Sequence, residues 1–531
     1  MSLKNEYEKL KQDREEFLQR GHRNSILTIP AALPLEGQQR HQLPQNFQSI
    51  GSRGVNNLSS KLLLTLFPPT LPFMRLKVAP STMASLVAEA GSEDKAAAVM
   101  AEVEASLSRI EKEAVSEFDQ DGWRPALAEG LRQAVITGNA LLYDRPGGLR
   151  PAAYDMRRYV VERDDEGTLL TVILQQALSK DAMRQALRES SEVSEAALEA
   201  MIAEASTNTE YGSNTGQPSY ALFTGAKLQP DGKYSYWQEI GSIEIPGTRA
   251  EVAREDLPLI PLMFQPVYGS SYGRGYVEDY DGDLLALESI SRALVEGSLA
   301  LAKILWLVKP GGSTKPSTLS ESPNGAIRQG DPDDVGTLQA EKGSDLAVAN
   351  LQQERLERRL SYAFLLNSSA QRSGERVTAE EIRFVAQELE DTLGGVYSSL
   401  ADTVQAPVVF YLFNKLKRTG RIGKLPKSIK PIVATGLEAI SRNHEVVRAQ
   451  QFIEMIERIV PPEERSIVLK TDTIAQDIAT SLNLDSSRFV RTPDEIEARR
   501  QAQAEQAFAE RVGPNAVNQL GAAAQQQQPD A

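Results

Sequence analysis

The sequence predicts an α+β fold that is mainly helical. Three observations predict it: long stretches with apolar residues at helical spacing, a run of short strands between residues 140 and 265, and connectors rich in glycine and proline. The 531 residues allow roughly three or four domain-sized units. The hydrophobic content of 41% is sufficient for a sizeable core.

The first 137 residues are predicted to be mainly helical. A charged helix at the start is expected to be solvated or to lie on a neighbour. After an irregular connector marked by prolines, a second helix carries leucines at four-residue spacing and stops at Phe67-Pro68-Pro69. The predicted helices are Leu3–Gln19, Val55–Leu66, Ala96–Phe118 and Pro125–Thr137.

Strands follow, so that residues 50–270 are predicted to form one mixed α+β unit. Asp164-Asp-Glu-Gly167 predicts a hairpin turn, Pro230-Asp-Gly232 predicts a second turn, and Lys180–Glu204 is predicted to be helical. The predicted strands are Ala140–Tyr143, Tyr159–Arg163, Leu169–Gln176, Tyr220–Phe223, Tyr234–Ile245 and Leu259–Phe264.

From Tyr276 the pattern changes to that of a long helix. Leucines at intervals of three and seven residues predict a heptad-like helix to about Lys303, roughly 40 Å long at ~1.5 Å per residue. Ser291 and Ser298 weaken this seam. The leucines are Leu284, Leu287, Leu294 and Leu301. Pro310–Asp334 is predicted to be an exposed loop with little core, and the helix resumes over Leu346–Leu366.

The stretch Asn367–Val396 joins a polar loop to a strongly amphipathic helix. Thr378 and Glu381 form a capping box at the start of the helix, which is expected to extend to Leu416 with a kink at Gly394-Gly395. The loop carries Arg372 and Arg376, whose guanidinium groups either contact an anionic polymer or lie in a solvated connector. Nearby, Arg355, Arg358 and Arg359 favour intersubunit or i,i+4 pairing over DNA binding.

Composition argues against catalysis and against several kinds of site. There are no cysteines, and three histidines lie far apart, so cysteine-based and HExxH metal sites are excluded and no cofactor or metal is expected. The phosphate-binding loop motif is absent, and no acidic pair is singled out as a catalytic or Mg²⁺ pair. We expect no enzyme activity.

The charge and hydropathy of the sequence argue against secretion, membrane insertion and the coating of DNA. The first residues are polar and charged, so no signal peptide is expected. The most apolar run, Leu299–Val308, contains Lys303 and is too short for direct membrane insertion. A protein that coats DNA is expected to be basic, so the net charge of −14 argues against that function. An acidic surface repels phosphate, however, and is compatible with a protein past which DNA slides.

Four blocks in order closely resemble the portal proteins, or head–tail connectors, of short-tailed, autographivirus-like bacteriophages. They are Gly51–Lys61 continuing to Phe67-Pro68, Ser271–Tyr276 with Gly282-Asp-Leu284, Arg372–Arg383, and Ala434–Ile440. The blocks keep the order and roughly the spacing of the family over residues 1–445. The resemblance fades in residues 180–220, in 310–335 and beyond about 480.

This resemblance implies a portal fold with wing, stem, clip and helical crown, assembled as a ring. It implies a wing at 1–270 with an N-terminal helical arm, stem helices at 271–305 and 346–366, a clip at 306–345, a tunnel loop at 367–377, a kinked wing helix and return at 378–435, a crown at 436–512 and a disordered tail at 513–531. Within it, Gln371, Arg372 and Arg376 would face the DNA channel. The four leucines would pack the stem and ring, and Lys315 and Arg328 would dock partners at the clip.

The implied function is a channel of twelve subunits, or thirteen in isolation, through which double-stranded DNA is packaged and ejected at one capsid vertex. The implied partners are the large terminase, scaffolding and major capsid proteins, the tail adaptor or tail tube, internal core proteins, and DNA without sequence preference. The protein would be in the virion, and in the host cytoplasm during assembly. A phage scaffold or internal core protein remains the alternative, although the strands at 140–265 argue against a scaffold.

Overall fold

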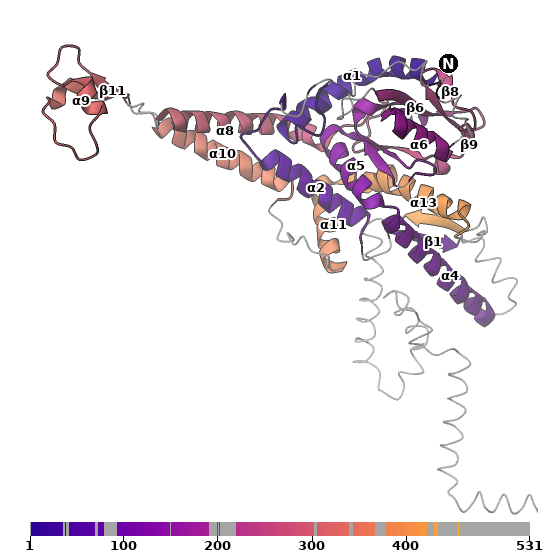
Figure 1. The fold of residues 1–531 in the computed structure, drawn as a ribbon. Coiled ribbons are helices and arrows are strands. Elements are labelled where there is room, and N and C mark those ends of the chain that lie inside the picture. The colour runs from indigo at the N-terminus through magenta and orange to yellow at the C-terminus, as the bar shows by residue number, and fades with distance from the viewer. Residues whose placement is uncertain are drawn as a thin grey trace, which may run out of the picture. The chain divides into compact units, whose positions relative to one another are not determined.

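The structure is a computed structural model. It describes residues 2–35, 38, 42–69, 73–78, 93–148, 150–190, 199, 201, 219–301, 305–338, 343–366, 379–421, 429–433 and 455. Contacts divide the chain into Met1–Leu437 and Glu438–Ala531, and the elements named below belong to the first unit (Figure 1). The predicted crown at 436–512 and tail at 513–531 lie outside the described residues, apart from Met455.

The described secondary structure is mainly helical, as the sequence predicted. The α-helices are α1 (Leu3–Leu27), α2 (Ile50–Leu66), α4 (Glu93–Gln120), α5 (Trp123–Thr137), α6 (Lys180–Ser190), α8 (Asp281–Leu301), α9 (Pro316–Ser320), α10 (Gly343–Ala363), α11 (Ala379–Leu393), α12 (Gly395–Leu400) and α13 (Ala406–Arg418). Short 3-10 turns are η2 (Met156–Arg158), η3 (Arg254–Asp256), η4 (Tyr276–Tyr280) and η5 (Pro332–Asp334), whereas η6 (Ala401–Gln405) is a π-helical turn.

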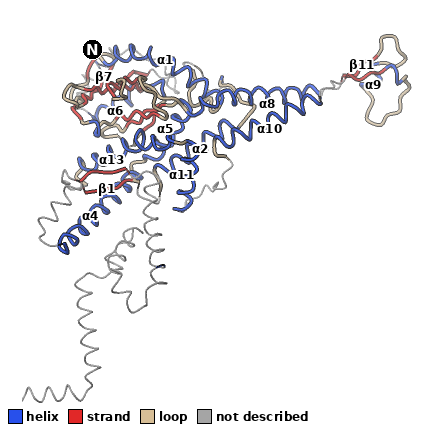
Figure 2. Tube along the Cα trace, turned by 180° about the vertical axis from the view of Figure 1, so that it is seen from behind, coloured by secondary structure: helices blue, strands red, loops and turns tan. Residues whose placement is uncertain are grey.

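The strand pairs of the described residues are all antiparallel. Figure 2 shows the strands in red. The largest sheet has the order β4 (Tyr159–Arg163), β5 (Leu169–Ser179), β6 (Ser219–Leu228), β7 (Tyr234–Ile240) and β8 (Ile243–Glu244), and β9 (Ala250–Val252) also pairs with β7. A second sheet places β2 (Asn139–Tyr143) between β10 (Leu259–Met263) and β3 (Ala152–Tyr154). The remaining pairs are β1 (Met74–Val78) with β13 (Ile429–Val433), and β11 (Leu305–Val308) with β12 (Val335–Leu338).

The hairpin predicted at Asp164–Gly167 is confirmed by the turn between β4 and β5. Oδ1 of Asp164 accepts hydrogen bonds from the backbone N–H of Glu166 at 3.1 Å and of Thr168 at 2.6 Å. Gly167 has φ +86°, which a residue with a side chain rarely adopts. These local contacts explain why the turn could be recognised from four residues.

The N-terminal helix α1 lies on the six-stranded sheet. Leu3, Tyr7 and Leu10 are buried there in one cluster with residues of β4, β5, β6 and β7. Arg14 is fully buried, and its Nη1 donates to the carbonyl oxygens of Arg157 at 2.9 Å and Tyr159 at 2.8 Å. Apolar positions at i, i+4 and i+7 make this charged segment amphipathic, so it covers a sheet face.

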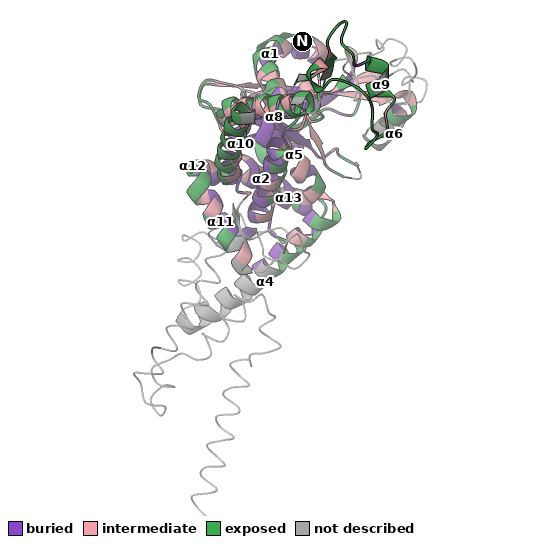
Figure 3. Ribbon diagram, turned by 90° about the vertical axis from the view of Figure 1, so that its left-hand side faces the viewer, coloured by how far each residue is buried: buried purple, intermediate pink, exposed green. Residues whose placement is uncertain are grey.

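The main core lies beneath α2 and α5, whose residues are coloured largely as buried in Figure 3. The predicted leucine stripe of α2 is confirmed, since Leu58, Leu62 and Leu66 are fully buried. Aromatic rings extend the core: Phe118 packs against Phe67 with ring centroids 5.4 Å apart and against Trp123 at 6.4 Å. Such contacts contribute about 1 kcal/mol each beyond apolar burial.

The predicted kink at Gly394-Gly395 is confirmed. Gly394 has φ +58° and separates α11 from α12, because a left-handed residue cannot continue a right-handed helix. The sequence did not predict the π-helical turn η6 that follows. Oγ1 of Thr403 within this turn donates to the carbonyl oxygen of Met263 at 3.0 Å, which attaches the turn to β10.

Other boundaries differ from the sequence prediction. The long helix predicted from Tyr276 begins with the 3-10 turn η4, and α8 starts at Asp281. Of the helix predicted over Lys180–Glu204, the structure describes Lys180–Ser190 as α6, and of its remainder only Glu199 and Met201 are described. The pairing of β1 with β13, which joins Met74 to Val433, was not predicted.

Candidate functional site

The three predicted channel residues, Gln371, Arg372 and Arg376, lie outside the described residues, but both ends of their loop are described. The chain before the loop leaves α10 through a turn in which Leu365 has φ +55°. A non-glycine residue in this left-handed conformation costs roughly 1–2 kcal/mol. Neighbouring contacts must therefore hold the turn in place.

Helix α2 supplies those contacts. Nδ2 of Asn57 donates to the carbonyl oxygens of Phe364 and Leu365, both at 2.9 Å. Nζ of Lys61 donates to the carbonyl oxygen of Leu365 at 3.0 Å and forms an ion pair with Glu388 of α11 at 2.9 Å. The Lys61 side chain is only 9% exposed. One buried ammonium group thus links the helix before the loop to the helix after it.

Aromatic packing fixes the base of the α8–α10 pair on the body. The hydroxyl of Tyr276 donates to the carbonyl oxygen of Ala363 at 2.9 Å, and the Phe364 ring contacts Tyr276 and Tyr280 with centroids 5.7 Å away in each case. A Cβ atom on Gly54 of α2 would lie 2.5 Å from Cγ of Phe364. Glycine at position 54 is therefore needed for this close approach.

The four predicted packing leucines of α8 have different environments. Leu284 and Leu287 are fully buried in the core of their own chain, so they pack the base of the helix pair. Leu294 is half-buried, and the side chain of Leu301 lies outside the described part of the structure. Leu284 and Leu287 have no surface left for a neighbouring subunit, and a role of Leu294 in a ring stays a prediction.

A second apolar stripe on α8 and α10 is exposed, and sequence analysis missed it. Figures 1 and 2 show the two helices side by side, and Figure 3 colours α10 mainly as exposed. The stripe, called the outer stripe below, comprises Leu285, Val295 and Leu299 on α8 and Val348, Leu351 and Tyr362 on α10. Leu285 and Leu299 are two heptads apart, as are Val348 and Tyr362, so the same periodicity argument could have found them.

The insertion between α8 and α10 begins and ends with the β11–β12 hairpin. Oδ2 of Asp334 accepts hydrogen bonds from the backbone N–H groups of Ser313 at 2.6 Å and Thr314 at 3.2 Å. Lys315 and Arg328, the predicted docking residues, are both exposed, and Nε of Arg328 donates to Oγ of Ser322 at 3.0 Å. Figure 1 shows the long connections around α9. The predicted exposed loop is therefore confirmed, and the structure shows in addition that the β11–β12 strand pair joins its two ends.

The Asp334 carboxylate is expected to organise this insertion in a pH-dependent way. The backbone hydrogen bond from Thr314, followed by those from Ser313, lowers the pKa of Asp334. Because the pKa of Asp334 is lower in the folded than in the unfolded chain, its carboxylate stabilises the loop at pH values above the unfolded pKa of about 3.9. This stabilisation is lost as the pH falls through the folded-state pKa.

At neutral pH, Asp334→Asn should mimic protonation and speed hydrogen exchange at residues 309–314. Asp333→Asn, whose carboxylate accepts no described hydrogen bond, is the control; equal exchange in both variants would contradict this role.

Among the residues that the structure describes, no group of three or more histidines and acidic residues could hold a metal ion. Within the same residues, no helix is both long and apolar enough to cross a membrane.

Comparison with known proteins identifies the family. A model described as bacteriophage head to tail connecting protein matches residues 1–490. Portal proteins of Escherichia phage T7 and Enterobacteria phage T3 are each 34% identical, over 93% of this chain and 88% of their own length. A solved chain from the virion of a native gene transfer agent particle is similar over 79% of this chain and 89% of its own, with 11% identity and a TM-score of 0.33.

The chain therefore belongs to the bacteriophage head to tail connecting protein family, which confirms the resemblance found in the sequence. Its function is that of a portal protein, a structural component of a phage virion.

Proposed function

We propose that copies of this chain close into a ring of twelve subunits, or thirteen in isolation, around a channel for double-stranded DNA. The observation that carries the proposal is the 34% identity with portal proteins over 93% of the chain. The outer stripe supports it, because one α8–α10 pair leaves these side chains in water whereas a neighbouring pair can cover them. A head-to-tail interface that closes on itself generates a ring.

Native mass spectrometry of the purified protein, with negative-stain end views of the same sample, tests this proposal. We expect a mass near twelve or thirteen copies and a central hole. A monomer, dimer or filament as the dominant species would contradict the ring.

The loop between α10 and α11 is proposed to contact DNA in the channel. Repetition around the ring axis would turn Arg372 and Arg376 into rings of positive charge, and Gln371 would lie beside them. Contacts to phosphate carry no sequence information, and an otherwise acidic subunit prevents tight binding, so DNA of any sequence could slide past.

Replacing Arg372 and Arg376 together by alanine is expected to leave rings intact and to reduce packaged or retained DNA by about tenfold or more, because two phosphate contacts are lost from every subunit. Packaging assays on rings of verified mass would measure this. Normal packaging and retention by the double variant would remove these residues from the channel role.

The insertion at residues 306–345 is proposed to dock the packaging ATPase, the large terminase, and later the tail adaptor or tail tube protein. Its described side chains are largely exposed, and among its basic residues Lys315 and Arg328 would suit acidic groups on a partner surface. The wing and crown side of the ring is proposed to meet scaffolding and major capsid proteins, and internal core proteins are proposed as further partners. The ring would assemble in the host cytoplasm and remain at one capsid vertex.

Reversing the charge of Lys315 and Arg328 with glutamate is expected to weaken terminase binding to assembled rings by about 10–100-fold, since opposite charges across the contact would become like charges. Binding titrations at two salt concentrations would measure the loss. Lys233→Glu, at an exposed hairpin turn outside the insertion, should leave affinity unchanged. Unaltered binding after removal of residues 310–335 from an intact ring would contradict the docking site.

A further inference from the structure

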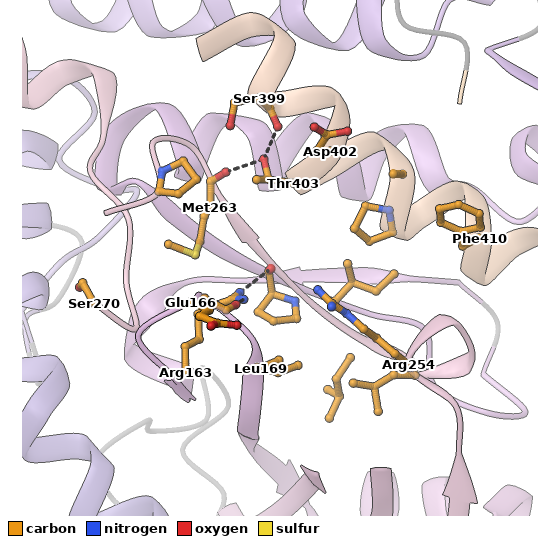
Figure 4. A pocket seen from close by; sticks show the side chains of 18 of the residues that line it. Arg163, Glu166, Leu169, Arg254, Met263, Ser270, Ser399, Asp402, Thr403 and Phe410 are labelled. Carbon is orange, nitrogen blue, oxygen red and sulfur yellow. Dashed lines mark hydrogen bonds between the residues drawn. The ribbon is translucent and has the colours of Figure 1, made fainter. Parts of the chain in front are cut away.

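The outer stripe of α8 and α10 differs in charge from the cavity beside β10. That cavity, of about 880 Å³, places Arg163 and Arg254 among the carboxylates of Glu166, Glu255 and Asp402, so its charge favours no single kind of ligand (Figure 4). The outer stripe instead runs past a pair of arginines on α10 and past a carboxylate on α8. Charges that are separated in this way allow one helix to select the other as its partner.

Two arginines interrupt the outer stripe on α10. Alternating intervals of three and four residues relate the members of this row, called the α10 seam below, so they share one face of the helix. The members are Val348, Leu351, Arg355, Arg358 and Tyr362, and all five side chains are exposed. A helix that packs on this face would cover the apolar members and surround both guanidinium groups.

Neither Arg355 nor Arg358 forms an ion pair within the described part of the chain. Glu354 lies one helical turn before Arg358 but accepts a hydrogen bond from Nδ2 of Asn350 at 3.2 Å. Two guanidinium groups one turn apart repel each other, so an acidic group placed between them is attracted by both.

The outer face of α8 repeats the same intervals and carries an acidic residue. The members of this α8 seam are Leu285, Glu288, Arg292, Val295 and Leu299. The carboxylate of Glu288 accepts hydrogen bonds from the backbone N–H of Phe47 at 2.9 and 3.1 Å and of Gln48 at 3.2 Å, which hold it in place. Nε of Arg292 donates to Glu296 at 2.9 Å, so this arginine already has an acidic partner. Glu288 forms no ion pair within the described residues, and its oxygens retain lone pairs for a guanidinium group.

Contacts within the chain align the two seams. Arg359 pairs with Asp283 near the body, and towards the other end of the helix pair a Cβ atom on Gly297 would lie 3.1 Å from Cδ2 of Leu346. Counting along the antiparallel helices from these contacts places Glu288 level with residue 354 or 355, within about one turn of both arginines. Rotation about a ring axis preserves height, so an α8–α10 pair that runs along the axis meets the arginines of the next copy at the level of Glu288.

We propose that Glu288 of one copy docks between Arg355 and Arg358 of the next copy, so that α8 of each subunit faces α10 of its neighbour. The inference rests on the proposed ring and deepens it by assigning the partner and the direction of this contact. The apolar members of both seams flank the charges and keep water from them. Charged residues within such a seam select the partner helix and its orientation.

The charges also oppose other contacts through the same face. A contact between two α10 helices would bring the arginine pairs of both copies together, and a contact between two α8 helices would leave both arginine pairs without an acidic partner. A two-fold dimer through this face is therefore disfavoured. The head-to-tail contact of α8 with α10 is the kind that closes into a ring.

Charge reversal on each side of the contact tests the docking. Glu288→Arg and the double variant Arg355→Glu with Arg358→Glu each place like charges together. Each should raise the protein concentration at which half of the chains are in rings by about tenfold or more, as measured by mass photometry. Glu288→Gln, which keeps an acceptor for Phe47 but removes the charge, should shift the concentration in the same direction by a smaller factor.

The matched control is Arg109→Glu on α4, because Arg109 is exposed and forms no ion pair among the described residues. This variant should assemble like the unmodified chain. Circular dichroism of each variant shows whether the subunit is folded.

Mixing the two charge-reversed chains distinguishes a head-to-tail contact from a general loss of assembly. The contact is complementary wherever the two chains alternate, so rings should form again at nearly the concentration that the unmodified chain needs. Alternation around a closed ring requires an even number of subunits. Native mass spectrometry should therefore show equal numbers of both chains in rings of twelve, and no rings of thirteen.

Four outcomes would overturn the inference while leaving the ring intact. They are normal assembly by Glu288→Arg, normal assembly by the double arginine variant, a mixture of folded chains that stays unassembled, and mixed rings of random composition. Normal rings of the double arginine variant that retain less DNA would assign the two arginines to DNA instead. An unmodified chain that forms no ring would overturn the proposed ring together with this contact.

Discussion

Replacing Leu285 and Leu299 together by aspartate is expected to convert rings into folded monomers. Both side chains are exposed in the single chain, so the substitutions do not disturb its own core. Covering a leucine at an interface contributes roughly 1.5–3 kcal/mol, and an aspartate there adds the cost of burying a charge. The two changes should therefore weaken each subunit contact by about 3 kcal/mol or more, which is a factor of about 100 or more in affinity.

Mass photometry over a concentration series would measure this shift. The double substitution of Leu319 and Ile327 by aspartate is the matched control, because both are exposed aliphatic residues of the insertion rather than of the outer stripe. We expect the control to assemble like the unmodified chain. Rings of normal mass and stability formed by the Leu285 and Leu299 variant would show that the outer stripe does not join subunits.

Replacing Lys61 by methionine is expected to loosen both flanks of the loop at 367–377. Methionine preserves the length and apolar stem of the side chain but leaves Glu388 without its cation and removes one donor from the carbonyl oxygen of Leu365. Removing one partner of a fully buried ion pair costs about 3–5 kcal/mol. Glu388 is 22% exposed, so water partly solvates its carboxylate, and we expect a smaller cost of about 2–3 kcal/mol.

Hydrogen exchange at the end of α10 and along α11 would measure the change. A loss of about 2–3 kcal/mol predicts exchange roughly 30–150-fold faster at those amides, with smaller changes in the six-stranded sheet. Arg53→Met is the control on the same helix, since Arg53 is exposed and forms no described ion pair. Exchange rates equal to those of the control would show that Lys61 does not hold the two flanks together. If the loop contacts DNA, Lys61→Met rings should also retain less DNA.

Where the signals were local, the sequence was sufficient to predict structure. The turn at Asp164–Gly167, the leucine stripe of α2 and the kink at Gly394 each depend on residues within a few positions of one another. The pairing of β1 with β13, the burial of Arg14 of α1 against Arg157 and Tyr159, and the bond between Thr403 and Met263 depend on distant parts of the chain. Local propensity carries no information on such contacts.

By itself, the sequence determined the mainly helical α+β class, the order of most elements and, through its four motif blocks, the family. Only the tertiary structure decided which side chains remain available for assembly. The four heptad leucines of α8 are equivalent in sequence, yet Leu284 and Leu287 are buried in the core of their own chain, whereas the side chains of the outer stripe are exposed. It also brought Lys61 to both flanks of the loop. Burial and pairing depend on the other elements that pack nearby, and spacing along the chain does not reveal them.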